Sequence, residues 1–328
     1  MEVYNVTHNA DLDGLSSAAM LVGSYGMPVK NIFFTDYTGR SVSHNFNRIK
    51  KARPSKAVFV FSDINVGRDQ ASTFMAMLEY LRKRGNRVIW MDHHIWEHKM
   101  ISTVSRLCDL MVVGENKEHC AAELVHIFLC KSSKKYARLS GIAHISDFNL
   151  YTHEKFRDGP LAKKLSIGIT GILGQKSVEK EESMLRGAVA ALARGRYPTG
   201  SMLAAYKRYI NESRLGMKIL SSNIFYVDAG KVRIGIGFAN KLNSSDACER
   251  IMADRGCDIA IYVKSSDGTA HLRRRGSVDC SVIARHFGGG GHPYASGFNI
   301  RGLQRGRLTS GSMTRFVKEV KEAGLSVY

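Results

Sequence analysis

The chain has 328 residues, of which 44% are hydrophobic and 23% charged, so we expect about two folded domains, and wholesale disorder is excluded. No apolar run reaches the ~18 residues that a membrane-spanning helix needs, and the first residues lack a signal-peptide pattern, which predicts a cytoplasmic protein without a membrane partner. The 48 lysines and arginines outnumber the 29 aspartates and glutamates, and the net charge of +19 favours a polyanionic partner such as nucleic acid.

The first 150 residues alternate between strand-like and helix-like segments. Helices are predicted at 14–25 and 69–84, where apolar residues recur at helical spacing. Short apolar runs predict strands at 3–7, 31–36, 57–61, 87–91 and 110–113. This β-α-β rhythm predicts a parallel sheet with helices on both sides.

The chain then becomes helical before strands return. Helices are predicted at 120–131, 136–146, 179–194 and 201–220. Later strands are predicted at 223–227, 231–238, 259–263 and 269–273, with helices at 244–254, 280–286 and 312–323. The predicted fold class is α/β, with a parallel-sheet catalytic domain over 1–200, a helical connector over 201–221 and a smaller mixed α/β substrate-binding domain over 222–328.

Four polar clusters each follow a predicted strand or helix. They are His8 to Asp13, then Asp63, then the triplet Asp92-His93-His94, and finally His144 with Asp147. Because the carboxyl ends of parallel strands share one edge of a sheet, the first three clusters should meet there. Taken singly, each has a structural explanation, such as helix capping by Asp11 and Asp13. Their joint occurrence in this order instead predicts a metal site.

Such a cluster calls for hard divalent cations. Several carboxylates brought together repel one another unless cations neutralise them. Carboxylate and imidazole ligands without thiolate suit Mn²⁺ or Mg²⁺ better than a structural zinc. Two such ions ~3.5–4 Å apart, bridged by one carboxylate, can clamp a phosphoryl group and activate water. The expected reaction is therefore phosphoester hydrolysis.

The same residues resemble the motifs of the DHH phosphoesterase superfamily, which includes single-strand exonucleases, oligoribonucleases, cyclic-dinucleotide phosphodiesterases and family II pyrophosphatases. The resemblance implies that the metal ligands are Asp11, Asp13, Asp63, His93 and Asp147, with Asp63 as the bridging group. It also implies that His94 faces the substrate phosphate, that Asp63, His93 and His94 are catalytic, and that Asp92 orients its neighbours. Many members place a metal-binding histidine where this chain has Thr7, so His8, one place later, is the candidate for that ligand.

A glycine-rich segment near the C-terminus is the second feature that indicates a function. Four consecutive glycines precede His292, and glycine lets backbone N–H groups approach an anion closely. Taken alone, such a run is also typical of a flexible loop. The segment resembles the Gly-Gly-Gly-His loop of the DHH-associated C-terminal domain, which implies that substrate is bound by Gly289, Gly290, Gly291, His292 and the strand residue Arg273. The alternative for Arg273 is a solvated basic strand edge.

These features predict a Mn²⁺-dependent phosphodiesterase, with two Mn²⁺ or Mg²⁺ ions, that hydrolyses short RNA or DNA oligonucleotides or dinucleotides to mononucleotides. A homodimer is a further expectation. The enzyme alternatives are a phosphatase for a 3′-phosphorylated nucleotide and a phosphodiesterase for linear or cyclic signalling dinucleotides. The alternative outside enzymes is a nucleic-acid-binding module with a structural metal. The glycine-rich loop argues against a pyrophosphatase, and the chain length against a processive exonuclease on long strands.

Overall fold

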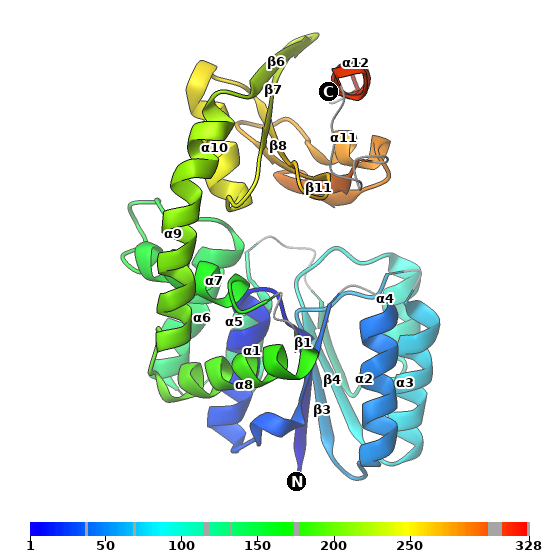
Figure 1. Cartoon of the computed structure of the whole chain (residues 1–328). Helices are drawn as coiled ribbons and strands as arrows, with labels where there is room; N and C mark the ends of the chain where they lie inside the picture. The colour runs from blue at the N-terminus through cyan, green and yellow to red at the C-terminus, as the bar shows by residue number, and fades with distance from the viewer. Residues whose placement is uncertain are drawn as a thin grey trace. The chain divides into compact units, whose positions relative to one another are not determined.

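A computed structural model describes residues 1–36, 39–67, 70–113, 118–131, 133–173, 177–300 and 310–326. The chain divides into two compact units, Met1–Tyr206 and Lys207–Tyr328, which are described separately (Figure 1). The division falls within helix α9 (Gly200–Ser221). Among the described residues, no helix is long and apolar enough to cross a membrane.

The N-terminal unit is built on a five-stranded sheet with the order β2-β1-β3-β4-β5, in which every neighbouring pair is parallel. The chain passes from β1 to β2 on one side and then returns to β3 on the other. The carboxyl ends of β1 and β3 therefore flank the point where strand order reverses, which is where ligands bind in open α/β sheets. The strands are β1 (Val3–His8), β2 (Ile32–Thr35), β3 (Val58–Ser62), β4 (Arg87–Asp92) and β5 (Leu110–Val113).

Helices cover both faces of this sheet (Figure 1). Strand β3 is buried along its length, and its successive side chains point to opposite faces of the sheet. Val58 and Val60 therefore lie in one core, and Phe59 and Phe61 lie in the other. The ring of Phe61 stacks on Trp90 with centroids 4.5 Å apart. One face carries α1 (Leu12–Tyr25), α5 (Ala121–Leu129), α6 (Lys134–Asp147), α7 (Gly159–Thr170) and α8 (Val178–Arg194), and the other carries α2 (Gly39–Ala52), α3 (Ala71–Lys83) and α4 (His98–Ser105). A short 3₁₀ turn, Val29–Asn31, precedes β2.

The C-terminal unit is built on a six-stranded mixed sheet with the order β10-β11-β9-β8-β7-β6, in which only β7 and β8 are parallel. Helix α10 (Ser244–Arg255) packs on one face, and α11 (Ser281–His286) and α12 (Ser310–Gly324) pack on the other. The strands are β6 (Ile224–Ala229), β7 (Val232–Ala239), β8 (Ile259–Lys264), β9 (Thr269–Arg274), β10 (Gly290–His292) and β11 (Ala295–Asn299).

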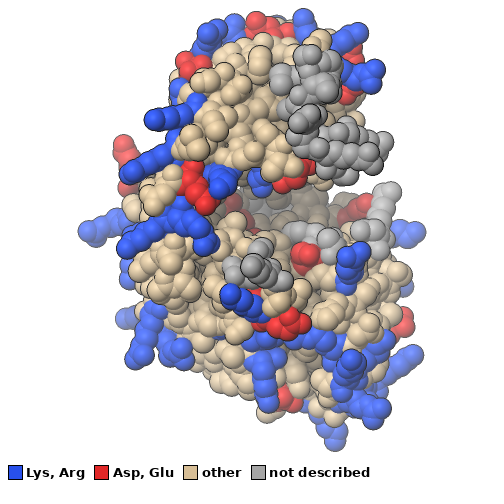
Figure 2. Space-filling view, viewed as in Figure 1, with Lys and Arg blue, Asp and Glu red and all other residues tan. Residues whose placement is uncertain are grey.

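The predicted fold class is confirmed, since a parallel α/β unit is followed by a smaller mixed α/β unit. Three helices, α2, α4 and α7, were not predicted. Helix α4 buries only Val104, so its apolar stripe is narrow, whereas α2 places Val42, Phe46 and Ile49 at helical spacing, a pattern that the sequence does contain. Lysine and arginine side chains are spread over much of the face shown in Figure 2, as the net charge leads one to expect.

Candidate functional site

The first polar cluster lies where β1 turns into α1. His8 is the last residue of β1, and Asp11 is the N-cap of α1, where its Oδ1 accepts a hydrogen bond from the Gly14 N–H at 3.1 Å. The Asp11 Oδ2 atom lies 2.9 Å from His8 Nδ1. Burial raises the pKa of Asp11, but the charge of His8 and this hydrogen bond outweigh it and hold the pKa below its ordinary value. Asp11 therefore caps the helix and also faces the site.

Asp13 is fixed by a helix that begins 108 residues later. Its carboxylate is buried, and its oxygens accept hydrogen bonds from the N–H groups of Ala121 and Ala122, at 2.8 and 2.7 Å. These amides form the first turn of α5, where unpaired N–H groups and the helix dipole favour a negative charge. Burial nevertheless raises the pKa of Asp13, although His93 opposes it. The carboxylate is thus held rigidly but in surroundings that disfavour its charge.

Asp63 directly follows β3 and has a left-handed backbone conformation, with φ of 58°. Its N–H donates to the Met91 carbonyl at 3.0 Å, which ties it to β4. The carboxylate is buried, and its Oδ2 atom makes no hydrogen bond to any described residue. Burial raises the pKa of Asp63 well above its ordinary value, and the charges of Asp11 and Asp13 raise it further. A buried carboxylate repelled by neighbouring carboxylates is suited to a cation.

His93 lies at the centre of the carboxylates. Its Nε2 atom is 3.7 Å from Asp13 Oδ2, 3.7 Å from Asp63 Oδ1 and 3.6 Å from Asp147 Oδ2, the last from the end of α6. Nε2 is buried and hydrogen-bonds to none of the described residues. The separations exceed hydrogen-bond length. They fit ligands of one ion, because atoms each ~2.1 Å from a shared octahedral cation lie roughly 3.0–4.2 Å apart.

Three groups of side chains could each hold a metal ion, with ligand atoms within 4.8 Å of one another. Asp63 belongs to two of the groups, as a bridging carboxylate would, and all the residues predicted as metal ligands belong to at least one. The groups are His8, Asp11 and Asp63; Asp13, His93 and Asp147; and Asp63, His93 and His94. Oxygen and imidazole donors around two orphaned buried atoms fit hard divalent cations.

Asp92 positions the second histidine of the triplet. Asp92 is fully buried at the end of β4, and His94 Nδ1 lies 2.8 Å from its Oδ1. Trp96 Nε1 donates to the Oδ2 atom at 2.6 Å. Burial lowers the pKa of His94, but the charge and hydrogen bond of Asp92 outweigh it and raise this pKa to about 9. His94 is therefore cationic near neutral pH in the metal-free protein, and Trp96 is a supporting residue that the sequence did not reveal.

A glutamate beside the site was also missed. Glu123 Oε2 accepts the Cys120 N–H at 3.0 Å and lies 2.7 Å from His144 Nδ1. The spacing from Cys120 to Glu123 is that of a capping box at the start of α5, so the sequence contained a signal for this residue. The His144 ring packs against Phe148 with centroids 4.6 Å apart. Among the described residues, His144 belongs to none of the metal-binding groups.

The glycine-rich segment folds into a tight loop and the short strand β10. Gly288 has a φ of 77° and Gly291 has a φ of 130°, backbone conformations that residues other than glycine rarely adopt. A Cβ atom on Gly289 would lie 2.1 Å from the Gly297 carbonyl oxygen, so the close approach to β11 also requires glycine. Ser296 Oγ donates to the His292 carbonyl at 2.6 Å and fixes the end of the loop. The fold alone therefore accounts for three of the four glycines.

Arg273 and His292 lie near each other on one face of the C-terminal sheet. His292 pairs with Ala295 of β11, and Ala295 pairs with Arg273 of β9, so all three side chains leave the same face. The His292 ring stacks on Tyr294 with centroids 5.2 Å apart. Arg273 Nη1 donates to the Leu272 carbonyl at 3.0 Å, which leaves the rest of the guanidinium for other partners.

Residues 230–323 match the DHHA1 domain family. No curated protein matches the sequence. The pGpG-specific phosphodiesterase PggH from Vibrio cholerae shares 13% identity, with a TM-score of 0.56 over 99% of this chain and 100% of that chain. An uncharacterized protein from Helicobacter pylori G27 shares 18% identity over 99% of both chains, with a TM-score of 0.43. A putative family II inorganic pyrophosphatase from Methanococcus jannaschii shares 12% identity over 98% of this chain and 99% of that chain, with a TM-score of 0.26.

The family match confirms the predicted resemblance to the DHH-associated domain for the C-terminal unit. The DHHA1 match covers the glycine-rich loop and Arg273, and the similarity to PggH shows a common fold across both units. Residues 230–323 therefore match a DHHA1 domain, and the chain shares its overall fold with PggH.

Proposed function

We propose that the protein is a metal-dependent phosphodiesterase that hydrolyses short oligonucleotides or dinucleotides to mononucleotides. The observation that carries this proposal is the convergence of buried carboxylates on His93 at the carboxyl ends of β1, β3 and β4, with Asp63 Oδ2 and His93 Nε2 left without hydrogen bonds among the described residues. The DHHA1 match and the fold shared with a pGpG-specific phosphodiesterase support this class of reaction.

The ligand sets indicate which residues would hold two Mn²⁺ or Mg²⁺ ions. His8, Asp11 and Asp63 form one set, and Asp13, His93 and Asp147 form the other, with Asp63 close enough to His93 to belong to both. Divalent cations bound here supply Lewis acidity, which activates water and balances the charge of the phosphoryl group. Asp13 keeps its orientation through the two α5 amides, so its carboxylate is preorganised for binding.

His94 is the residue best placed to contact the substrate phosphate. Its ring is cationic near neutral pH in the metal-free protein because Asp92 accepts a hydrogen bond from Nδ1–H, so both ring nitrogens carry a proton. Asp92 is in turn fixed by Trp96. An imidazolium so oriented stabilises negative charge on a phosphoryl oxygen. Arg273 and His292 in the C-terminal unit are proposed to bind the nucleotide part of the substrate, as a guanidinium suits phosphate.

A linear signalling dinucleotide is the favoured substrate among the alternatives, because the similar structure PggH is described as pGpG-specific. The net charge of +19 adds an attraction for any oligonucleotide that is independent of sequence and weakens as salt rises. We therefore expect turnover of pGpG and of short oligonucleotides, with the rate falling as the chain lengthens.

The test is a product time course on 5′-labelled oligonucleotides of increasing length and on pGpG, with Mn²⁺ or with a chelator. Wild type is compared with His93→Ala and with His98→Ala, in which an exposed histidine of α4 is removed as a matched control. We expect mononucleotide products only with metal, a loss in kcat of more than ~10³-fold for His93→Ala, and no loss for the control. Full activity in metal-stripped protein, or tight oligonucleotide binding without turnover, would contradict the proposal.

A further inference from the structure

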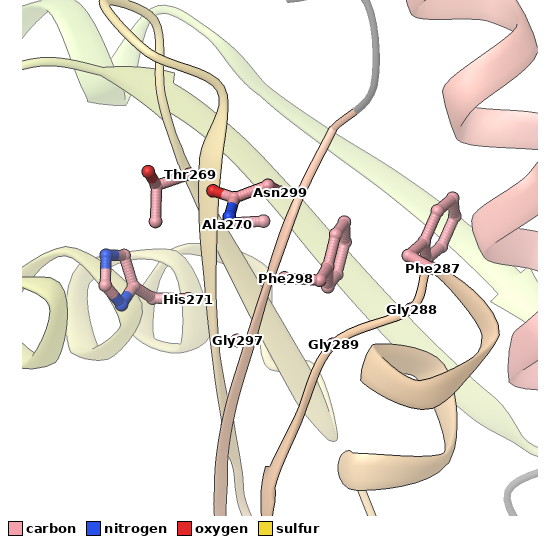
Figure 3. A pocket seen from close by; sticks show the side chains of 9 residues that line it. All are labelled: Thr269, Ala270, His271, Phe287, Gly288, Gly289, Gly297, Phe298 and Asn299. Carbon is pink, nitrogen blue, oxygen red and sulfur yellow. The ribbon is translucent and has the colours of Figure 1, made fainter. Parts of the chain in front are cut away.

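A pocket of about 430 Å³ lies in the C-terminal unit beside the glycine-rich loop. It is lined by residues of β9 and β11 and by Phe287 to Gly289, which directly precede β10 (Figure 3). Of the predicted substrate contacts, Gly289 lines it, whereas Arg273, His292 and the metal-binding groups do not. The polar side chains of the pocket have therefore been given no role so far.

The side chains around this pocket divide by chemistry. Thr269, His271 and Asn299 leave one face of the two strands, whereas Phe298 leaves the other face and packs there against Phe287, which follows α11 (Figure 3). The two phenylalanine rings stack with centroids 4.5 Å apart and belong to the core. Gly297 pairs with His271 and has no side chain, so no side chain covers the backbone at this position on the face that carries His271. A flat surface flanked by an imidazole and an exposed amide is thus available to a planar ligand.

His271 contains a polar atom without a partner. Its Nε2 is buried and hydrogen-bonds to none of the described residues, and a buried unpaired polar group is unfavourable. The ring stacks on Tyr262 with an interplanar angle of 19°. Burial lowers the pKa of His271 to about 4, and Lys264 and Arg273 add to the effect. The ring is therefore neutral at pH 7, with one donor and one acceptor, which suits the uncharged edge of a base better than a phosphate.

The position of His271 relative to Arg273 supports the same ligand. The two residues are separated by one residue on β9, so they leave the same face roughly 6.6 Å apart along the strand. That is about the spacing between the phosphate and the base of one nucleotide. Arg273 supplies the charge that a phosphate requires, and His271 and Asn299 supply neutral groups where the base would lie.

We propose that this pocket is a nucleobase subsite, in which the base of a nucleotide whose phosphate binds Arg273 lies over Gly297 while His271 and Asn299 hydrogen-bond to its edge. The proposal rests on the proposed function for the identity of the ligand as a nucleotide. Because Nε2 faces inward, binding requires a rotation of the imidazole about its Cβ–Cγ bond, which is a soft torsion in histidine. The subsite would make affinity depend on the base and not only on the phosphate.

The experiment is calorimetric titration of the full chain, in chelator, with GMP and with ribose 5-phosphate. Chelation removes any contribution of the metal site to phosphate binding. We expect GMP to bind wild type about tenfold more tightly than ribose 5-phosphate, which corresponds to about 1.4 kcal/mol. His271→Ala should remove that difference by weakening GMP alone, and Asn299→Ala should reduce it. Arg273→Ala should weaken both ligands.

The control is His286→Ala, which removes an exposed histidine of α11 that does not line the pocket and should leave both affinities unchanged. Equal affinity of wild type for the two ligands, or equal weakening of both by His271→Ala and Asn299→Ala, would overturn the proposal. Because the titration involves no turnover, it separates this subsite from the proposed function. A protein that fails to hydrolyse oligonucleotides but loses GMP selectivity in His271→Ala retains the subsite.

Discussion

Replacing Asp63 with asparagine should stabilise the metal-free protein while abolishing its function. Asp63 is buried among Asp11, Asp13 and Asp147, all of which raise its pKa. Asparagine has the same shape, tolerates the left-handed backbone at φ of 58°, and removes one of the mutually repelling charges. The same change removes the carboxylate shared by two of the metal-binding groups.

The size of the effect follows from the repulsion that is removed. Two unit charges about 5 Å apart repel by roughly 3 kcal/mol at an effective dielectric constant of about 20. Protonation of Asp63 relieves part of this, so we expect a gain of about 1–3 kcal/mol, or roughly 3–10 °C in the unfolding midpoint for a unit of this size. Because folding raises the carboxyl pKa, the folded state binds more protons than the unfolded state, and wild type loses stability as pH rises above the ordinary aspartate pKa. The difference between variant and wild type should therefore grow from pH 5 to pH 8.

Thermal unfolding at pH 5, 6.5 and 8, in chelator and in Mn²⁺, measures both effects. In chelator the Asp63→Asn variant should melt above wild type at pH 8, and in Mn²⁺ the order should reverse because only wild type gains metal-binding free energy. Asp109→Asn is the matched control, because Asp109 accepts the Val88 N–H and pairs with Arg82 far from the metal groups. It should lower stability and leave the response to Mn²⁺ unchanged. A metal-free Asp63→Asn variant that melts below wild type at pH 8 would refute the reasoning.

Three further outcomes are expected. Asp92→Asn should lower the pKa of His94 in the metal-free protein from about 9, because burial is then opposed by the charges of Asp147 and Asp11 without that of Asp92. An imidazole NMR titration measures this, and an unchanged pKa would show that Asp92 does not set the charge. Arg273→Ala should reduce kcat/KM at least about tenfold on a dinucleotide but little on bis(p-nitrophenyl) phosphate, because only the larger substrate gains binding energy from this remote contact. Equal losses on the two substrates would show that Arg273 has a structural role. Gly289→Ala should destabilise the C-terminal unit by about 1–3 kcal/mol, whereas Gly290→Ala, where an added Cβ meets nothing within 4 Å, should be tolerated; chemical unfolding compares the two.

Much of the fold could be predicted because its signals are local. The apolar runs that become β3 and β4 are buried on both faces, and burial on both faces requires such runs. The predicted helix at 14–25 begins two residues earlier, at Leu12, because Asp11 caps it. Helices that bury little, such as α4, left no comparable pattern. Periodicity therefore identified most of the elements that form the core, although it missed α7, whose Ala162, Leu165 and Ile169 lie in that core.

The glycine-rich segment shows the limit of a local signal. A run of four glycines predicts an anion-binding loop, but the structure gives most of them a conformational or steric task of their own. The pocket beside it depends on the pairing of His271 with Gly297, residues that lie 26 positions apart and share no motif. Strand pairing is decided by tertiary packing, so no sequence pattern predicted this pocket.

The sequence by itself determined which residue types follow the buried strands, and the chemistry of carboxylates and imidazoles then pointed to divalent cations. Only the tertiary structure decided how those side chains are held. The amides that orient Asp13 belong to α5, 108 and 109 residues away, and the indole that fixes Asp92 comes from Trp96. The physical reason is the separation along the chain over which each effect acts. Backbone propensity and burial pattern depend on a few neighbouring residues, so they can be recognised in the sequence. The orientation and pKa of a buried side chain depend on whichever groups the folded chain brings within hydrogen-bond distance.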